Sequence, residues 1–328
     1  MWVCLTWLNP YPGRMHALHW IAAGPQGLSD FRLVETEVRE PDRGEVTITV
    51  QASGVNPADL KHAARATSFP VAVGYEVAGT ITALGPNTEI ASGGGAVGDA
   101  VVAFRVQGGW ASMLTVPAET VLARPTTLSA AESANLLLVG TTAADMLRVA
   151  QVAPGETVAL LGATGAVGAS LLQIARSRGI HVIGVCGQAR GTEVARFGGV
   201  AVERGEDLAE RIALAAGDPV AAVLDASGRE DDVAAALTIA ADRSRMVTIV
   251  GTDAARQAGF IAISGTMAES AAFRDSVRAD IIALAESGEL VVPVAKTFVL
   301  RQAVEAMELV SSGRAGGKVA LVADSNDS

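Results

Sequence analysis

Cysteine, lysine and aromatic residues are all scarce in this sequence, and the scarcity of the first two excludes whole classes of protein. The two cysteines, Cys4 and Cys186, lie far apart and have no CxxC spacing. They can therefore build neither a disulfide framework nor a structural zinc site. A chain without a disulfide pattern is typical of a reducing compartment, so we expect a cytoplasmic protein.

Positive charge is also in short supply. The net charge is −10, and the only lysines are Lys61, Lys296 and Lys318. Proteins that bind DNA or RNA need clustered basic side chains to neutralise phosphates, and no such stripe is present. We therefore expect no nucleic-acid partner.

Apolar runs long enough to cross a membrane are missing too. Residues 1–14 hold a short apolar stretch without the basic segment of a signal peptide, and Met15 opens a strand pattern, so 1–14 are interpreted as an extension. The run 158–175 is interrupted by glycines and by Gln173, which indicates a buried strand, a turn and a helix. We expect a soluble protein with no membrane partner.

The residues that are abundant favour a globular protein with two domains. Apolar residues make up 50% of the chain and charged residues 18%, the opposite of a disordered composition. Up to about residue 130 the pattern is that of short strands separated by Gly-Pro and Gly-Gly turns. Strands are predicted at 45–52, 77–83, 100–104 and 113–116. This region is expected to form a small β-barrel or sandwich.

Beyond residue 130 the pattern changes to alternating helices and strands, which predicts a doubly wound parallel sheet and an α/β fold class. Helices are expected at 130–138 and 142–149, and a longer helix at 268–286 precedes a strand-helix-strand tail. We expect one domain from 1–138 and 268–328 and a second from 139–267. The alternating segments lie at 157–161, 166–178, 181–185, 192–197, 201–202, 208–215, 221–225, 231–241 and 245–250.

A glycine-rich loop follows the predicted strand 157–161 and opens a helix. Glycines let the backbone approach a dinucleotide pyrophosphate, and the first amides of the helix point at its negative charge. The spacing is GxxGxxG rather than the commoner GxGxxG, and a tight turn that serves packing alone is the alternative. The predicted cofactor-binding loop comprises Gly162, Ala163, Thr164, Gly165, Ala166, Val167 and Gly168.

The end of the next strand indicates which dinucleotide binds. An NAD site places an acidic residue there for the ribose 2′-hydroxyl. This chain has no carboxylate between Cys186 and Arg190, so the guanidinium of Arg190, helped by Gln188, favours the 2′-phosphate of NADPH. The alternative is that Arg190 is an ordinary surface residue.

Six segments in order resemble the zinc-free quinone oxidoreductases of the medium-chain dehydrogenase/reductase superfamily. They cover nearly all of 15–322 and are Gly54-Val55-Asn56-Pro57-Ala58-Asp59-Leu60-Lys61, Gly74-Tyr75-Glu76-Val77-Ala78-Gly79, Gly108-Gly109-Trp110-Ala111, Gly140-Thr141-Thr142-Ala143-Ala144, the glycine loop, and Ser312-Gly313-Arg314-Ala315-Gly316-Gly317-Lys318. The resemblance implies a GroES-like β-rich catalytic domain for 1–138 and 268–328, a Rossmann domain for 139–267, and an active site in the cleft between them.

The resemblance also bears on zinc. In zinc-dependent relatives, zinc ligands stand at the positions of Asn56 and Tyr75 and near Leu138. Asn, Tyr and Leu do not form a catalytic zinc site, and the four-cysteine lobe is absent, so no metal is expected. The four histidines (His16, His19, His62, His181) show no metal spacing, and His181 is interpreted as an interior strand residue.

Without a metal, the substrate must already be electrophilic, as a quinone or an α,β-unsaturated ketone is. Asn56 and Tyr75 are the predicted catalytic residues, because an amide and a hydroxyl can donate hydrogen bonds to the oxygen that gains charge. For Asn56 the alternative is a turn role before Pro57, and for Tyr75 it is core packing. Glu76 is expected to be buried and structural.

Five further residues are predicted to contact the cofactor. Ser227, Gly251 and Thr252 follow strands whose carboxyl ends face the ligand in a doubly wound sheet. Arg314 and Lys318 are assigned from the resemblance alone, and Lys318 could equally be a surface charge.

The expected function is NADPH-dependent hydride transfer to a quinone or enone. An enoyl-thioester reductase, or an NADPH-binding structural protein with weak activity, are the alternatives. A homodimer is also expected, because the apolar segment 260–265 would form an edge strand that needs covering, and relatives commonly associate in this way.

Overall fold

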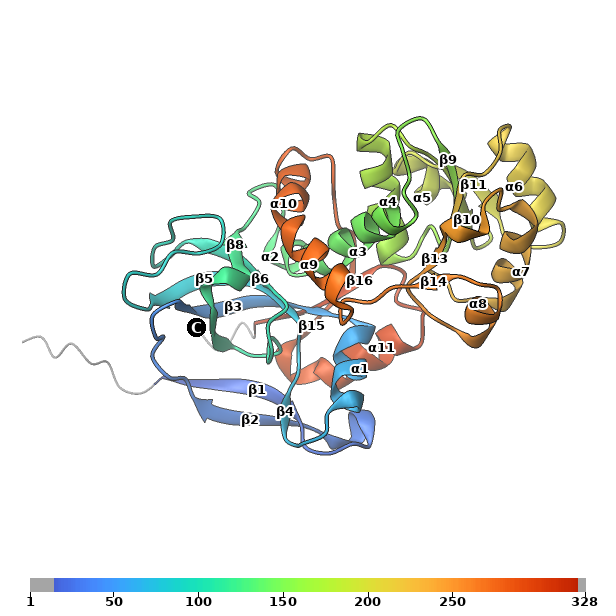
Figure 1. Ribbon diagram of the computed structural model, residues 1–328. Helices are drawn as coiled ribbons and strands as arrows, with labels where there is room; N and C mark the ends of the chain where they lie inside the picture. The colour runs from blue at the N-terminus through green and yellow to red at the C-terminus, as the bar shows by residue number, and fades with distance from the viewer. Residues whose placement is uncertain (1–14, 324–328) are drawn as a thin grey trace, which may run out of the picture. The chain divides into compact units, whose positions relative to one another are not determined.

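The computed structural model describes residues 15–323, which divide between two compact units (Figure 1). The first unit runs to Ala123 and also includes 298–307 and the segment from Leu321 onward. The second unit comprises 124–297 and 308–320. The chain therefore leaves the first unit and returns to it, and it first changes unit after Ala123 rather than at the predicted residue 138.

The first unit is rich in antiparallel strands. A three-stranded sheet has the order β2-β1-β4, and a larger sheet has the order β15-β16-β3-β5-β6-β8 with β7 also paired to β3. The division between the units passes through β15 and β16. The strands are β1 His16–Ala22, β2 Phe31–Glu37, β3 Glu45–Val55, β4 Val71–Ala72, β5 Glu76–Leu84, β6 Ala100–Phe104, β7 Met113–Pro117, β8 Val121–Ala123, β15 Val294–Val299 and β16 Lys318–Val322.

Strand β3 forms where alternation predicted it. Val46, Ile48 and Val50 are buried together with residues of β5, β6 and β7 in one apolar cluster. Side chains two apart on a strand face the same side, so this spacing supplies the core of the sheet. The strands predicted at 77–83, 100–104 and 113–116 are present as β5, β6 and β7.

The second unit contains a six-stranded parallel sheet in the order β11-β10-β9-β12-β13-β14. The strands are β9 Thr157–Leu161, β10 His181–Cys186, β11 Val200–Glu203, β12 Ala222–Asp225, β13 Met246–Thr248 and β14 Ile261–Ala262. The helices between them are α4 Ala166–Ser177, α5 Gly191–Arg196, α6 Leu208–Ala216, α7 Glu230–Ile239 and α8 Asp253–Gln257.

Helices cover both faces of this sheet. A Cβ on Gly184 of β10 would lie 2.7 Å from Val194 of α5, which places α5 on that face. Ala159 and Leu161 of β9 instead cluster with residues of α6, α7 and α8. Figure 1 shows α4 and α5 on one side of the strands and α7 and α8 on the other. The predicted doubly wound sheet is confirmed.

Two helix boundaries differ from the prediction. Helix α3 (Leu136–Val149) runs through Gly140, where a break was predicted, and the break follows α2 (Ala130–Ser133) instead. Gly140 is used for packing: a Cβ there would lie 2.7 Å from Cγ2 of Ile281. The predicted helix 268–286 divides at Val277 into α9 (Ala268–Ser276) and α10 (Arg278–Glu286).

Helices α9 and α10 group with the second unit, whereas the prediction assigned them to the catalytic domain. The fully buried carboxylate of Asp145 on α3 accepts hydrogen bonds from Arg148 (2.7 Å from Nη2) and from Arg274 of α9 (3.1 Å from Nε). A buried carboxylate needs such partners, so Asp145 holds α9 against α3. This pairing could not be read from hydrophobic periodicity.

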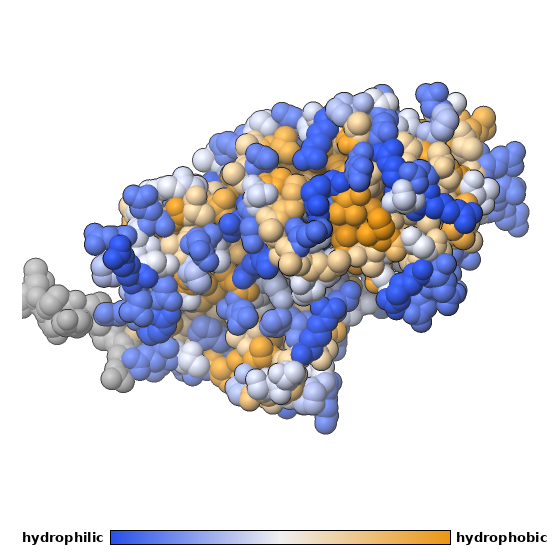
Figure 2. Space-filling model, viewed as in Figure 1, coloured by the Kyte–Doolittle hydropathy of each residue, from blue (hydrophilic) through white to orange (hydrophobic). Residues whose placement is uncertain are grey.

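The remaining helices are α1 (Pro57–Arg65) and α11 (Ala303–Ser311). Within 15–323, none of the helices has the length and apolar character needed to cross a bilayer. On the face shown in Figure 2, hydrophilic residues are interspersed with hydrophobic groups. His181 is exposed at the first position of β10, so its interpretation as an interior residue was wrong.

Candidate functional site

The glycine loop makes a tight turn between β9 and α4. Gly162 has φ +83°, a conformation that L side chains rarely adopt, and a Cβ there would lie 3.1 Å from the backbone nitrogen of Ser227. A Cβ on Gly168 would lie 2.4 Å from the carbonyl oxygen of Gly162. The first and third glycines of the motif are therefore required by the backbone itself.

The second glycine has a different role. Gly165 caps α4, is exposed, and has φ −74°, and a Cβ there would meet only the Gly162 oxygen, at 3.3 Å. Having no side chain, it provides no acceptor for the first amides of the 12-residue helix. Those amides and the helix dipole suit an anion, so the residues present fit a dinucleotide pyrophosphate.

Loops that follow β12 and β13 lie at the same edge of the sheet as the glycine loop. The fully buried carboxylate of Asp225 accepts from the Ser227 amide (2.9 Å), the Gly228 amide (2.9 Å) and the Thr248 hydroxyl (2.7 Å). It thereby holds together the turns that carry the predicted contacts Ser227, Gly251 and Thr252. Strands β9 and β12 are neighbours in the middle of the sheet, where doubly wound folds bind dinucleotides.

The hydroxyls of Ser227 and Thr252 in these turns also form hydrogen bonds within the protein. The Ser227 hydroxyl lies 3.0 Å from a carboxylate oxygen of Asp232, and the Thr252 hydroxyl accepts from the amide of Ala255 at the start of α8. Both residues lie at the edge of the sheet where a ligand is expected, and their contact with the cofactor stays a prediction.

A small cavity of about 40 Å³ lies beside the glycine loop. It brings the turn 316–318 next to Thr164 and Gly165, and buried Lys318 lines it. Arg314 is exposed and does not line this cavity. The cavity is lined by Thr164, Gly165, Ala166, Ala169, Ser170, Glu193, Phe197, Val291, Val292, Pro293, Gly316, Gly317 and Lys318.

Arg190 lies against this loop and is already ion-paired. Its Nε and Nη2 atoms donate to the two carboxylate oxygens of Glu193, at 2.7 and 2.5 Å. Nη2 also lies 3.4 Å from the carbonyl oxygens of Thr164 and Gly316. The hydrogen bonds to Glu193 raise the pKa of Arg190. Arg190 thus joins α5, the glycine loop and the 316–318 turn.

Two carboxylates near this loop were missed from the sequence. Glu193 holds Arg190, and Glu203 accepts a hydrogen bond of 2.9 Å from the amide of Ala189. The sequence prediction considered only carboxylates that directly follow β10. Glu203 lies on the neighbouring strand β11, which pairs in parallel with β10 and sets Glu203 beside Cys186. Gln188 is exposed on the same loop. The guanidinium that was predicted to favour NADPH therefore has two carboxylates in its neighbourhood.

In the first unit, Asn56 is the residue that precedes α1. Its backbone amide donates to Asp59 (2.7 Å), and its side-chain Nδ2 donates to Oε1 of Glu76 (3.1 Å). All three residues are almost completely buried, as expected for Glu76. The Asn56 amide is thus directed at Glu76, and a contact with substrate stays a prediction.

Tyr75 faces a residue that sequence analysis did not select. Its hydroxyl lies 2.8 Å from Nδ1 of His62 on α1, and the rings meet edge-on with centroids 5.2 Å apart. Both side chains are half-buried. Burial and the negative charge of Asp59 raise the pKa of Tyr75, while Arg105 and Arg65 act in the opposite direction. The hydroxyl therefore stays protonated at neutral pH.

No three His, Cys, Asp or Glu side chains within 15–323 come together in a way that could hold a metal ion. Tyr75 and Asn56 are engaged with His62 and Glu76 as described, and Leu138 is a half-buried residue of α3.

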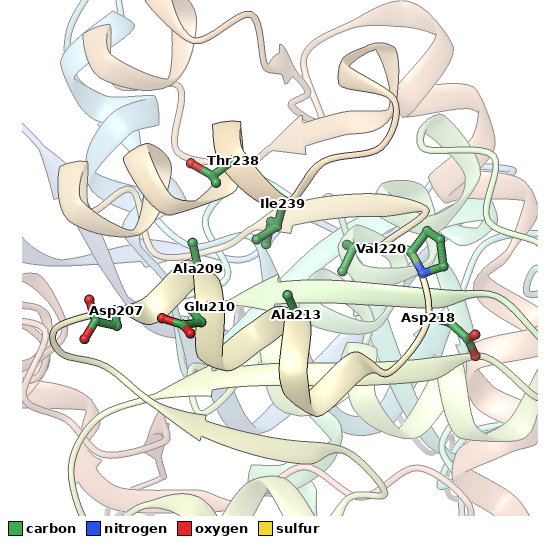
Figure 3. A pocket seen from close by; sticks show the side chains of 9 residues that line it. Asp207, Ala209, Glu210, Ala213, Asp218, Val220, Thr238 and Ile239 are labelled. Carbon is green, nitrogen blue, oxygen red and sulfur yellow. The ribbon is translucent and has the colours of Figure 1, made fainter.

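A larger cavity lies elsewhere in the second unit (Figure 3). It measures about 450 Å³ and is bordered by α6, the end of α7 and the segment that leads into β12. Its charged groups are the carboxylates of Asp207, Glu210 and Asp218. A dinucleotide carries several negative charges and would be repelled there, so the glycine loop remains the better cofactor site.

Two family patterns match the sequence. Residues 42–126 match the alcohol dehydrogenase GroES-like domain, and 200–321 match the family described as zinc-binding dehydrogenase. Among curated proteins, a pikromycin polyketide synthase component of Streptomyces venezuelae is 30% identical over 324 residues. That match covers 94% of this chain and only 8% of the synthase component.

Solved structures show the same fold. The native structure of a mycobacterial quinone oxidoreductase is 26% identical with a TM-score of 0.76, and the match covers 93% of this chain and 99% of that one. A mycobacterial protein complexed with NADPH is 25% identical with a TM-score of 0.78, covering 93% and 99%. The CurK enoyl reductase is 23% identical with a TM-score of 0.82, covering 94% and 99%, a likeness of fold alone.

Proposed function

The chain belongs to the medium-chain dehydrogenase/reductase superfamily as a quinone oxidoreductase-like member, and we propose that it is an NADPH-dependent reductase of quinones or α,β-unsaturated carbonyls that works without a metal ion. The observation that carries this proposal is the exposed, glycine-capped start of α4 with Arg190 beside it. Such a helix start suits an anion, and the guanidinium close by supports the binding of a phosphorylated dinucleotide.

The second unit would bind the cofactor, which supplies the hydride when bound. The amides at the start of α4 would hold the pyrophosphate, and the turns ordered by Asp225 would contact the nicotinamide half. Arg190 would pair with the 2′-phosphate by exchanging it for the carboxylate of Glu193. The similarity to a mycobacterial protein that was solved with NADPH supports this assignment.

The first unit would stabilise the oxygen of the substrate. A carbonyl or quinone that accepts hydride at carbon develops negative charge on oxygen, and a neutral hydroxyl donor stabilises that charge. Tyr75 is such a donor because burial raises its pKa. The buried Asn56–Glu76 pair would hold the start of α1 in place. Zinc ligands of relatives stand at the positions of Asn56 and Tyr75 and near Leu138, and these three residues support a reaction without metal.

A second candidate is an enoyl-thioester reductase. It is favoured by the match over 94% of this chain to one part of a polyketide synthase component. The chemistry is related, since a thioester conjugated to a double bond also accepts hydride at carbon and gathers charge on oxygen.

Mixing the purified protein with NADPH and either 9,10-phenanthrenequinone or crotonyl coenzyme A tests both candidates. Loss of NADPH absorbance with the quinone supports the proposal, and loss with the thioester alone supports the second candidate. A heat-denatured sample of the same protein controls for direct reaction. If neither acceptor nor a panel of simple enones consumes NADPH or NADH, the proposed function is wrong.

A further inference from the structure

His62 and Tyr75 form a pair of titratable side chains in the first unit. The 2.8 Å separation of the hydroxyl oxygen and Nδ1 is a normal hydrogen-bond length, and the edge-on ring contact fixes their mutual orientation. His62 belongs to α1 and Tyr75 immediately precedes β5, so two separate elements bring the groups together. The pair joins an ionisable group to the hydroxyl that the proposed function places next to the substrate.

We propose that His62 is the proton-relay partner of Tyr75, a positioning residue that both orients the Tyr75 hydroxyl toward the substrate and returns its proton. This inference rests on the proposed function. The inference extends that function by naming the source of the proton that the reduction consumes.

The direction of the hydrogen bond decides whether Tyr75 can act. When Nδ1 of His62 carries a proton, it donates to the Tyr75 oxygen, and the hydroxyl hydrogen is free to point at a substrate oxygen. When Nδ1 is bare, the hydroxyl donates to His62 and is no longer available. The Nδ1-protonated form is therefore the active one, and imidazolium always has it.

The proton balance of the step is simple. The O–H bond of Tyr75 breaks, and its proton goes to the substrate oxygen, which holds the electron pair displaced by the incoming hydride. The Nδ1–H bond of the His62 imidazolium then breaks, and that proton restores the Tyr75 hydroxyl, which leaves a neutral ring protonated at Nε2. His62 takes a replacement proton from water, which is accessible to its half-buried ring. The substrate is reduced, the nicotinamide cofactor is oxidised, and one solvent proton is consumed.

The charges around the pair fit this role. The first unit sets Asp59 and Arg65 of α1 and Arg105, which follows β6, within electrostatic reach of Tyr75. Burial and Asp59 oppose ionisation of the hydroxyl, and the two arginines partly offset them. Tyr75 is thus kept as a neutral proton donor while remaining able to pass through a short-lived anionic state beside two guanidinium groups.

Because the chain has few tyrosines, the ionisation of Tyr75 can be measured without catalytic turnover. The chain has two tyrosines, Tyr11 and Tyr75, so a Tyr11→Phe variant leaves Tyr75 as the sole tyrosine. Its ionisation can be followed by tyrosinate absorbance in the absence of cofactor. We expect His62→Ala in this background to raise the pH at which Tyr75 ionises, because the tyrosinate loses the Nδ1–H donor. An unchanged titration curve would overturn the inference.

Kinetics provide the second readout. We expect Tyr75→Phe to lower kcat roughly 100-fold, the lower end for loss of a general acid. His62→Ala should lower kcat roughly tenfold with little change in KM, and should flatten the dependence of kcat on pH. His62→Asn sets an amide N–H near the position of Nδ1, so it should recover part of kcat while keeping the flat pH profile.

The control is His16→Asn, which changes an exposed histidine of the same unit and should match the wild type at every pH. Thermal unfolding of each variant distinguishes a loss of folding from a loss of proton transfer. If His62→Ala is unstable, His62→Asn provides the test instead. An active wild type whose kcat profile is unchanged by His62→Ala and His62→Asn overturns the inference alone. A wild type that transfers no hydride to any acceptor overturns the proposed function together with it.

Discussion

Arg190 shows that the role of one residue depends on which neighbours compete for it. The guanidinium favours a 2′-phosphate, yet in this structure its Nε and Nη2 atoms donate to the carboxylate of Glu193. A phosphate carries more negative charge than a carboxylate and offers three acceptor oxygens, so it can replace Glu193 in this ion pair. We therefore expect the proposed NADPH preference to require Arg190 and to be weakened by Glu193.

We expect Arg190→Ala to raise KM for NADPH and to leave KM for NADH nearly unchanged. Loss of a charge-assisted contact amounts to about 1.5–3 kcal/mol, or roughly 10- to 100-fold in binding. Glu193→Gln is the matched variant and should lower KM for NADPH, because it frees the guanidinium. Steady-state kinetics with both cofactors checks this, and a wild type that prefers NADH would contradict it.

Glu156 carries a pH-dependent part of the stability of the second unit. The Arg245 guanidinium, donating at 2.6 Å, lowers the pKa of Glu156 from 4.5 to about 2, and the Ala153 amide adds to the effect. A lowered pKa stabilises the folded state above the ordinary value. That contribution is lost as pH falls from 4.5 to about 2.

Glu156→Gln should therefore lower the free energy of unfolding at pH 7 by about 1 kcal/mol, a value kept small because the carboxylate is partly exposed. The difference from wild type should shrink as pH falls below the ordinary carboxylate range. Urea unfolding at a series of pH values measures it. A difference that stays constant down to the lowest pH would show that the ion pair is not its cause.

At the scale of elements, the three glycines of the loop differ in what they do. Gly168 lies where the backbone of α4 meets the backbone of the turn, and Gly165 lies at the exposed start of the same helix. The GxxGxxG spacing predicted a dinucleotide loop as a whole, and only the distances separate the glycine needed for folding from the one left open for ligand.

Gly168→Ala should destabilise the protein by about 1–3 kcal/mol, because its Cβ would overlap the Gly162 oxygen and backbone atoms must move. Gly165→Ala should change stability by less than about 1 kcal/mol yet weaken cofactor binding, since its methyl group would occupy the open approach. Thermal unfolding and NADPH fluorescence titration distinguish the two. Equal loss of stability in both variants would contradict this assignment.

The buried ion pairs of Asp145, which connect helix α3 to helix α9, can also be tested at the scale of elements. Asp145→Asn removes the buried carboxylate that Arg148 and Arg274 share and should cost about 3 kcal/mol. The control is Asp253→Asn, which breaks an exposed pair with Arg256 and should cost less than about 0.5 kcal/mol. Urea unfolding that showed similar small effects for both would mean that Asp145 does not hold α9.

At the scale of the whole molecule, the edge strand β14 bears on assembly. The predicted edge strand is present, but Phe260 and Ile263 are already buried within the unit and only Ile261 is exposed. Of these three side chains, a dimer through this edge would therefore have only Ile261 left to cover. The Ile263 amide donates to the Thr248 oxygen of β13, so the alternation of a strand directs the Ala262 amide toward the open edge.

We propose a homodimer in which two β14 edges pair. Ala262→Pro removes the outward amide and leaves the bond of Ile263 to β13 intact, so it should separate the dimer without unfolding the unit. Light scattering on the wild type and the variant measures this. A wild-type protein that is monomeric in dilute solution would exclude the proposal.

Metal independence is a property of the whole chain as well. Catalytic turnover should survive incubation with EDTA, and elemental analysis should find no stoichiometric zinc. One zinc ion bound tightly per chain would contradict the assignment of Asn56, Tyr75 and Leu138.

Local sequence determined much of the fold. Alternation in 45–52 predicted β3, strand-helix alternation predicted the parallel sheet, and the glycine loop was found because a pyrophosphate turn needs glycines at fixed spacing. These features are local, since each depends on residues within one or two elements. The break expected at Gly140 was wrong. The glycine instead makes room for Ile281 of α10, and sequence patterns near Gly140 cannot show a contact with a helix so far along the chain.

Only the tertiary structure decided which groups meet. Asp145 with Arg274, Glu203 with the Ala189 amide, and Tyr75 with His62 are all contacts between separate elements. Charges and hydroxyls have no periodic signature, because a single polar side chain contributes nothing to the hydrophobic pattern that predicts an element. Sequence by itself therefore determined the fold class and the strand, glycine turn and helix of the predicted cofactor loop. Packing of distant elements decided the partners that tune Arg190 and Tyr75.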